Sequence, residues 1–250
     1  MFFYNSLKSD LYKLCHSPLL LIHFIVPVIG IILFVLYYSF SSLNEFNKLS
    51  AYIQIVSVSF PALIGIITSI LADSEQKAGD FQMLLSTATP KYIPHSTKLI
   101  WLILFGFCSS LLALVGFGIG FSILGYKTFN LLFYIKTAVL LSISVIPLYL
   151  LHYIISFILG KGYSLGLGII GSLLSALFLT GLGDGIWTVL PWGITARFSE
   201  TLLASNLMNI DFFRFNGIIQ SMIFILIFTF LFLITLILLA NKWEGRESED

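Results

Sequence analysis

Residues 73–98 read DSEQKAGDFQMLLSTATPKYIPHSTK, and this polar stretch interrupts an otherwise apolar sequence. It holds six charged residues in 26, whereas long apolar runs precede and follow it. Within it, Ala78, Phe81, Leu84 and Leu85 recur at helical spacing before a Thr-Pro pair ends the pattern. The spacing predicts a short amphipathic helix at the membrane surface, between two membrane-spanning helices, where it can contact a second protein.

The composition of the whole chain points to a membrane. Of its 250 residues, 58% are hydrophobic and 10% are charged, whereas a soluble domain carries about a quarter charged residues. So few charges cannot cover a surface that faces water. The net charge of +1 gives no indication of nucleic acid as a partner. We therefore expect an all-α integral membrane protein, with residues 1–250 forming a single transmembrane domain.

Six runs without formal charge predict six membrane-spanning helices. They cover residues 19–40, 51–72, 99–126, 137–160, 163–183 and 215–241. The first run has 22 residues, and at a rise of 1.5 Å per residue it spans roughly 33 Å, enough to cross the hydrocarbon core. Residues 41–50, with Lys48, are expected to form a polar hairpin, and Pro61 is expected to kink the second span.

Residues 1–18 predict a helix that lies in the membrane interface instead of crossing it. Its apolar face would carry Phe3, Leu7, Leu11 and Leu14, and its polar face Asn5, Lys8, Ser9, Asp10 and Lys13. The apolar run that follows is too long for a cleavable signal peptide, and no small-residue cleavage site follows it.

Six spans place both termini on the same side of the membrane. On that side lie Lys8, Lys13, Lys77, Lys91, Lys98, Lys161, Lys242 and Arg246, and on the other Lys48, Lys127, Lys136, Arg197 and Arg214. Eight cationic residues against five predict, by the positive-inside rule, that both termini are cytoplasmic. Residues 73–98 would then face the cytoplasm, and residues 184–214 would face outward.

Glycine motifs occur inside the fifth predicted span. Gly166, Gly168 and Gly171 have the spacing GxGxxG, but a dinucleotide site needs a preceding strand and a soluble βαβ unit. Small residues in a membrane helix let a neighbouring helix approach closely, so we interpret these glycines as packing positions. The same interpretation applies to Gly162 and Gly166, which have the spacing GxxxG.

The sequence offers no catalytic pattern and no metal-binding pattern. Cys15 and Cys108 are two lone cysteines, and the histidines in the spans, His23 and His152, have no acidic residue within a helical turn. A phosphate-binding loop of the form GxxxxGK[ST] is missing too, so the chain itself is expected to bind no cofactor. If it performs work driven by ATP, a separate subunit must supply the ATPase.

Residues 184–214 are more patterned than a simple loop, and we expect them to form an extracellular or re-entrant segment. Trp187, Leu190 and Trp192 form an apolar, aromatic cluster, and residues 197–207 have the spacing of a short helix. One interpretation is a plain interfacial cap over the bundle. The other is an outer gate, or a contact for an amphipathic ligand, formed by Trp187, Trp192, Arg197 and Phe198.

The order of these features resembles the ABC-2 type permeases, the membrane subunits of one class of ABC transporter, which have a type V exporter-like fold. Members of that family tend to carry a Glu, a Gly, an apolar pair, a Thr-Pro stop and a Lys in the first cytosolic loop. Here these are Glu75, Gly79, Leu84-Leu85, Thr89-Pro90 and Lys98. The family often has Thr after the Gly, and this chain departs from it with Asp80.

Within that family the chain is similar to the permeases of lantibiotic self-protection transporters. The similar features are the length, the loop sequence AGDFQMLLSTA at 78–88 and the tail NKWEGRESED at 241–250. The resemblance implies two related permeases, or two copies, paired with an ATPase dimer that binds ATP and Mg²⁺. It also implies a location in the bacterial plasma membrane and export of an amphipathic antimicrobial peptide.

The resemblance further implies that the loop is a coupling helix docked in a groove of the ATPase. Phe81, Met83, Leu84 and Leu85 would fill that groove, Glu75 and Lys77 would pair at its rim, and Lys161 would add a minor contact. Gly79 belongs to the same loop motif. The alternative for the apolar residues is simple anchoring to the lipid surface.

Three functions thus remain open at the level of sequence. The first is an exporter of a lantibiotic, and the second is the same architecture with another substrate, such as a drug, a different bacteriocin or a lipid-linked glycan. The third is a polytopic membrane enzyme. An enzyme needs polar groups that converge inside the bilayer, and the predicted spans hold very few of them.

Overall fold

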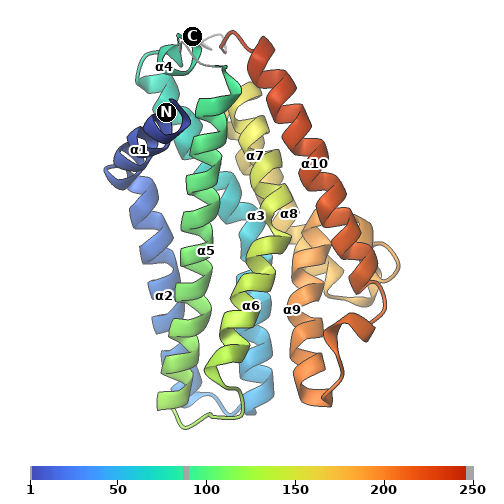
Figure 1. The fold of residues 1–250 in the computed structure, drawn as a ribbon. Helices are drawn as coiled ribbons and strands as arrows, with labels where there is room; N and C mark the ends of the chain where they lie inside the picture. The colour runs from blue at the N-terminus through green and yellow to red at the C-terminus, as the bar shows by residue number, and fades with distance from the viewer. Residues whose placement is uncertain (1, 87–89, 246–250) are drawn as a thin grey trace.

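The computed structural model describes residues 2–86 and 90–245, apart from the side chain of Met83, and all regular structure in this part is helical (Figure 1). Five helices are long and apolar enough to cross a membrane: α2 (Pro18–Phe40), α3 (Glu45–Lys77), α5 (Tyr92–Ile123), α8 (Lys161–Phe178) and α10 (Ile218–Lys242). The pair α6 (Leu131–Ser144) and α7 (Ile146–Ile158), bent by 41°, makes a sixth if it is one span. The prediction of a multi-pass helical membrane protein is confirmed.

The helix α1 (Phe2–Cys15) and the C-terminal end of α10 lie at the same end of the bundle, which we call the termini end (Figure 1). The opposite end is called the far end. The helix α1 lies across α5, where the indole nitrogen of Trp101 donates to the carbonyl of Leu7 at 2.9 Å. The N-terminal segment is therefore helical, as predicted.

The far end differs from the predicted polar hairpin at residues 41–50. The helix α3 already begins at Glu45, because the side chain of Asn44 accepts a hydrogen bond from the backbone nitrogen of Asn47 at 2.8 Å and caps it. Lys48 is 1% exposed. Its amine donates to the carbonyls of Tyr38 and Ser41, both at 2.9 Å, and to the Tyr126 hydroxyl at 2.7 Å. Lys48 thus ties α2 to α3 and is not a loop charge.

The helices α3 and α8 approach each other closely at glycines. A Cβ atom added to Gly65 would lie 2.7 Å from the Ser164 carbonyl oxygen, and one added to Gly168 would lie 2.8 Å from that of Pro61. A Cβ on Gly171 would meet the Trp192 ring at 2.4 Å. The packing role predicted for Gly168 and Gly171 is confirmed, because no larger side chain fits between these backbones.

The other glycine pair of α8 does not pack within the chain. A Cβ atom added to Gly162 or to Gly166 would meet nothing within 4 Å. The predicted packing role of this GxxxG pair is therefore wrong within the monomer. The reason is helical periodicity, which turns these two positions away from α3 while Gly168 faces it.

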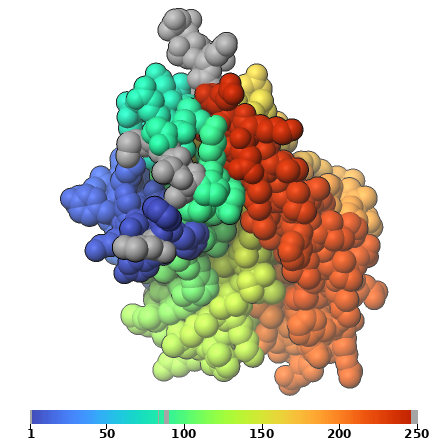
Figure 2. Space-filling model, turned by 45° about the horizontal axis from the view of Figure 1, so that its top comes forward, coloured from blue at the N-terminus to red at the C-terminus, as the bar shows by residue number. Residues whose placement is uncertain are grey.

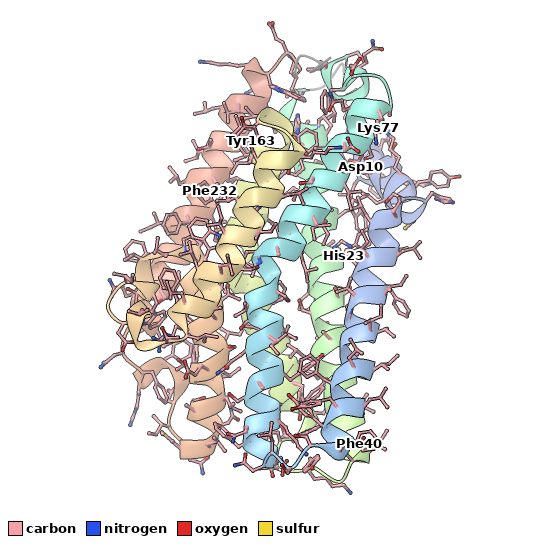
Figure 3. All side chains as sticks on the ribbon, turned by 180° about the vertical axis from the view of Figure 1, so that it is seen from behind. Asp10, His23, Phe40, Lys77, Tyr163 and Phe232 are labelled. Carbon is pink, nitrogen blue, oxygen red and sulfur yellow. The ribbon has the colours of Figure 1, made fainter. Side chains whose placement is uncertain are left out.

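The fourth predicted span, residues 137–160, is a broken helix. It starts earlier, at Leu131, and bends at Val145, directly before α7 and two residues before Pro147. A proline fits the first turn of a helix but cannot donate a backbone hydrogen bond to a preceding turn. The break therefore lies at the position that this proline dictates. The helix α3 holds Pro61 without a break, although it changes direction in its middle part (Figure 3).

Residues 184–214 enter the bundle instead of covering its surface. Most of them belong to α9 (Pro191–Met208), flanked by short 3-10 helices at Gly181–Gly183, Trp187–Val189 and Phe212–Arg214. The hydroxyl of Ser199 lies 3.2 Å from that of Ser57, near the middle of α3, and the hydroxyls of Ser144 and Thr195 are 3.0 Å apart. From there α9 runs to the far end (Figure 1). The interpretation as a plain cap is wrong, because these buried hydroxyls bond inside the bundle.

Two glycine variants test the packing of α3 on α8. Gly168→Ala places a methyl group against the Pro61 backbone, so we expect a loss of about 1–3 kcal/mol in unfolding free energy. Gly166→Ala, two residues away and without a neighbour, should be neutral or stabilise the helix by up to about 1 kcal/mol. Thermal unfolding of both variants in detergent measures the difference. Equal stability of the two would contradict the close approach.

Candidate functional site

The polar loop after α3 is a tight turn followed by one turn of helix. Gly79, Asp80 and Phe81 all have positive φ angles, of 119°, 46° and 63°. The single helical turn α4 then covers Gln82–Leu85. The predicted amphipathic helix is thus much shorter than its apolar spacing indicated, because three consecutive left-handed residues cannot belong to an α-helix.

The turn also gives a physical reason for an Asp at position 80. Its φ angle of 46° lies in the left-handed region, which Asp tolerates better than a β-branched residue does. Asp80 therefore allows the turn that sends the next residue, Phe81, inward.

Phe81 and Leu84 point into the protein, with 1% and 2% of their surface exposed. The Phe81 ring lies 4.9 Å from the Trp243 ring and 5.9 Å from that of Phe157, measured between centroids. The His95 ring lies 5.3 Å from Phe157 and 5.6 Å from Trp243. We call these four rings the aromatic cluster. It joins the loop to α5, α7 and the segment after α10.

The expectation that Phe81 and Leu84 fill a groove on a partner is therefore wrong for this conformation, since neither side chain is free. Leu85 is half-buried, near Gly245. The predicted groove residue Met83 and the predicted stop residue Thr89 have side chains outside the described part of the chain. The apolar spacing correctly indicated that one side of the loop is buried, but that side is buried against other parts of the same chain.

The exposed side of the loop is polar. Lys77, Gly79, Asp80 and Gln82 are exposed, as is Lys161 at the start of α8. The Asp73 carboxylate lies 2.8 Å from the Lys77 amine and 3.6 Å from the Lys161 amine, so it forms an ion pair with each of them. We call Lys77, Asp80, Gln82 and Lys161 the polar loop surface. In Figure 2 the loop after α3 and the end of α10 meet on the termini end.

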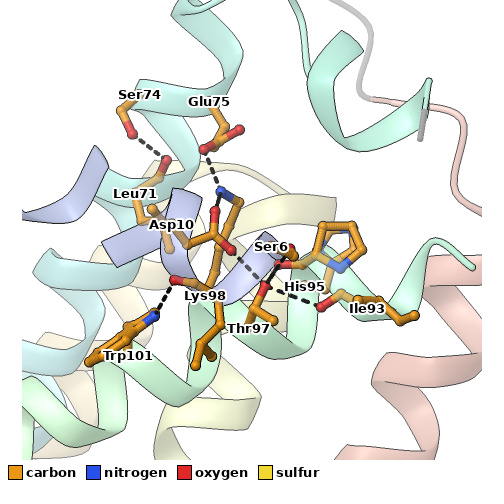
Figure 4. A network of polar contacts seen from close by, with 12 residues as sticks. Ser6, Asp10, Leu71, Ser74, Glu75, Ile93, His95, Thr97, Lys98 and Trp101 are labelled. Atoms are coloured by element: carbon orange, nitrogen blue, oxygen red, sulfur yellow. Dashed lines mark hydrogen bonds and ion pairs between the residues drawn. The ribbon is translucent and has the colours of Figure 1, made fainter. Parts of the chain in front are cut away.

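A buried ion cluster lies beneath this surface. The Lys98 amine is 2.6 Å from Asp10 Oδ1 and 2.8 Å from Glu75 Oε1, and the three side chains are 3%, 6% and 9% exposed (Figure 4). The predicted position of Glu75 at the rim of a partner groove is wrong, because its carboxylate is already paired with Lys98. The cluster joins α1, α3 and α5.

Hydroxyl groups extend the ion cluster. Thr97 Oγ1 donates to the second carboxylate oxygen of Asp10 at 2.6 Å and lies 3.1 Å from Ser6 Oγ (Figure 4). Two carboxylates around one amine leave a formal charge of −1, and the Thr97 hydroxyl offers Asp10 a further donor. Asp10 was expected on the polar face of α1; it is buried against α5, whereas Asn5, Lys8, Ser9 and Lys13 of that face are exposed.

Sequence reasoning missed Asp10, Thr97 and His95 as members of this site. The sequence did contain a signal for Asp10, which is an acidic residue in the N-terminal helix. Its partner Lys98 is the lysine directly before a long apolar run. The pairing itself spans 88 positions, and nothing in the spacing fixes it.

The four residues predicted as an outer gate form a separate region, where α8 passes into α9. Arg197 Nε donates to the Phe178 carbonyl at 2.6 Å, and its guanidinium also binds the Thr180 carbonyl at 2.9 Å and the Asp184 carboxylate. These bonds satisfy carbonyls left free at the C-terminal end of α8. Arg197 thus acts as a cap between two helices.

The aromatic members of that region are packed. Phe198 is buried and meets the Phe212 ring at 5.5 Å between centroids. Trp187 and Trp192 are half-buried, the first against Gly193 and the second against Gly171. These contacts give the aromatic residues a structural role in the packing of α9. Their role in substrate recognition stays a prediction.

Comparisons of this chain with protein-family models, with curated proteins and with solved structures found no match.

Removing the central cation tests the ion cluster. Lys98→Met leaves two carboxylates buried without a counter-charge, so we expect a loss of about 3–5 kcal/mol in unfolding free energy. The matched control is Lys77→Met, which removes a largely exposed partner of Asp73 and should change stability by about 0–1 kcal/mol. Thermal unfolding in detergent compares them. A Lys98→Met protein as stable as Lys77→Met would refute the cluster.

The left-handed turn is tested at Asp80. Asp80→Val puts a β-branched side chain at a φ angle of 46° and should destabilise the loop by about 1–3 kcal/mol. Asp80→Asn keeps a residue that tolerates this conformation and should behave like the wild type. Protease cleavage between residues 77 and 98 measures the opening of the loop. Faster cleavage only in the Asn variant would contradict this account.

Proposed function

We propose that this chain is the membrane-spanning permease subunit of an ATP-driven ABC-2 exporter. The proposed cargo is a lantibiotic or similar amphipathic antimicrobial peptide, expelled from the bacterial plasma membrane so that the producing cell is protected. The observation that carries the proposal is the loop after α3, which has a polar outward surface and a buried inner side in contact with several helices.

The buried side of the loop suits a mechanical role. A push on the polar loop surface reaches α5, α7 and the end of α10 through Phe81 and the aromatic cluster. The same push reaches α1 and α5 through Glu75, Lys98 and Asp10. Packed rings and short ion pairs form a contiguous network, which is one way in which coupling between distant sites is carried.

The proposed contact with the ATPase is polar, in contrast to the apolar contact that the sequence indicated. Lys77, Lys161 and Asp80 offer charges of both signs on one surface, and these can pair with charges on a partner. Phe81 and Leu84 then act as internal anchors that hold this surface against the bundle. ATP and Mg²⁺ bind to the partner subunit, because the chain lacks a phosphate-binding loop.

Pairing with a second permease, or with a second copy, is supported by the outer face of α8. Gly162 and Gly166 have open space beside them, and Tyr163 and Ile170 next to them are exposed. Small residues on an exposed membrane helix allow close approach of another helix. The choice of a lantibiotic as cargo rests on the sequence resemblance of residues 78–88 and 241–250.

Charge reversal on the polar loop surface tests the coupling role. We expect the double variant Lys77→Glu, Lys161→Glu to recover at least about tenfold less ATPase on co-purification, because tenfold corresponds to about 1.4 kcal/mol, which is roughly the low end for the loss of a single close charge pair. Tolerance of the cell to the lantibiotic should fall with it. The experiment uses the full chain co-expressed with an ABC ATPase and a partner permease of the same exporter class.

The matched control is Lys127→Glu, which changes another exposed lysine, beyond α5 at the far end, and should leave ATPase recovery unchanged. If the wild-type chain recovers no ATPase, the permease proposal fails. If ATPase is recovered but lantibiotic tolerance does not depend on the chain, the exporter carries another substrate. Equal loss in the control would place the contact elsewhere.

A further inference from the structure

The helix α1 presents a cationic face to its surroundings. Lys8 and Lys13 are exposed on it, whereas the one acidic residue of this helix, Asp10, is buried and paired with Lys98. The exposed face of α1 thus holds two positive charges and no negative one. The polar loop surface at the same end differs from it, because that surface carries charges of both signs.

An open hollow on this face of α1 is lined by Asn5, Lys8, Ser9, Tyr12 and Lys13. Its lining provides two amines, one amide and two hydroxyls, all of which donate hydrogen bonds. None of these five side chains forms a hydrogen bond or an ion pair with another residue of the described chain. Free donors with positive charge match the oxygens of an anionic group such as a phosphate.

The helix α1 lies at the depth where the neighbouring helices become apolar. It ends at Cys15, and the uncharged run of α2 starts at Leu19. The indole of Trp101, which donates to the Leu7 carbonyl, is two residues inside the uncharged run of α5 that starts at Leu99. In Figure 1 the loop with α4 extends farther out than α1 does. The headgroups of a bilayer lie at such a boundary, in a layer of about 5–8 Å on each side of the hydrocarbon core.

Aromatic side chains on the same helix favour a lipid over a soluble anion. Phe2, Tyr4 and Tyr12 are all largely exposed. Such rings are enriched at the membrane interface, because one part of the ring contacts apolar chains while a polar tip stays in the headgroup layer. Figure 2 shows α1 at the outer surface of the molecule, where lipid can reach it.

We propose that the exposed face of α1 binds the headgroup of an anionic phospholipid, such as phosphatidylglycerol, from the leaflet at the termini end. The lipid phosphate accepts hydrogen bonds from Lys8, Lys13 and the neutral donors of the hollow. Its acyl chains run along α2, where Leu21 and Phe24 are exposed. The burial of Asp10 serves this site, because a carboxylate on the exposed face would repel the phosphate. The site is independent of the proposed export function, since it requires only that α1 lies at the membrane boundary.

A competition between two lipids with the same acyl chains tests the headgroup preference. The purified full chain in non-ionic detergent micelles receives equal amounts of dioleoyl phosphatidylglycerol and dioleoyl phosphatidylcholine. Native mass spectrometry then gives the ratio of the two lipids on protein that retains one lipid. The wild type should favour phosphatidylglycerol. The double variant Lys8→Gln, Lys13→Gln should lower the ratio about tenfold or more, because tenfold corresponds to about 1.4 kcal/mol and each lysine beside anionic lipid contributes about 1 kcal/mol.

Two further variants serve as controls. Lys8→Arg, Lys13→Arg keeps both charges and should keep the lipid ratio of the wild type. Lys77→Gln, Lys161→Gln removes two exposed lysines from the polar loop surface at the same end and should also keep it. The glutamine variant of α1 is expected to fold, because the side chains of Lys8 and Lys13 are exposed and unpaired.

Protection from acetylation gives a second measurement, on the unmodified chain. An amine-reactive reagent should modify Lys8 and Lys13 more slowly in micelles with phosphatidylglycerol than in micelles with phosphatidylcholine. Lys77, on the loop that extends beyond α1, should react equally in both. Sodium chloride at about 1 M should remove the protection, because it shortens the Debye length to about 3 Å. Peptide mass spectrometry measures each lysine separately.

Three results would overturn the proposal. The first is the same lipid ratio in the wild type and in the glutamine variant of α1. The second is a reactivity of Lys8 and Lys13 that does not differ between the two lipids. The third is equal protection by glycerol 3-phosphate, which has no acyl chains, since this would show that the face binds a soluble anion instead of a lipid.

Discussion

The close approach of the α3 and α8 backbones is the constraint on which the rest of the bundle depends. In a membrane, lipid is as apolar as the side chains, so helices associate through packing and internal hydrogen bonds. Gly65 and Gly168 allow the packing. The hydroxyls of Thr68 and Ser164, 3.2 Å apart, add a hydrogen bond across the same contact, and His152 Nδ1 lies 3.0 Å from Ser164 Oγ.

The sequence predicted the membrane-crossing helices well, because their length is set by the thickness of the bilayer and their apolar content by its interior. It failed at Lys48, because residue type alone cannot tell a lysine that donates to two carbonyls and a tyrosine hydroxyl from a lysine in a loop. It predicted a helix within α9 and a re-entrant segment, but it did not predict that Ser199 bonds inside the bundle or that Arg197 binds a carbonyl at the end of α8.

The candidate site shows what amphipathic spacing can predict. The spacing of Phe81 and Leu84 indicates that one side of the segment is covered, and it cannot tell a partner protein from the rest of the chain. Pairing in space is equally hidden from spacing, as Asp10 and Lys98 show across 88 positions. The loop is thus buried on its inner side and polar on its outer side.

The contact between Phe81 and Trp243 has a consequence for how the protein is made. The two rings meet across 162 positions of sequence, so the loop emerges from the ribosome long before the residue that covers it. Until Trp243 arrives, Phe81 lacks one wall of its pocket, and long-range contacts of this kind form late in folding. A chain interrupted during α10 would therefore lack the Trp243 ring that covers Phe81 at the termini end.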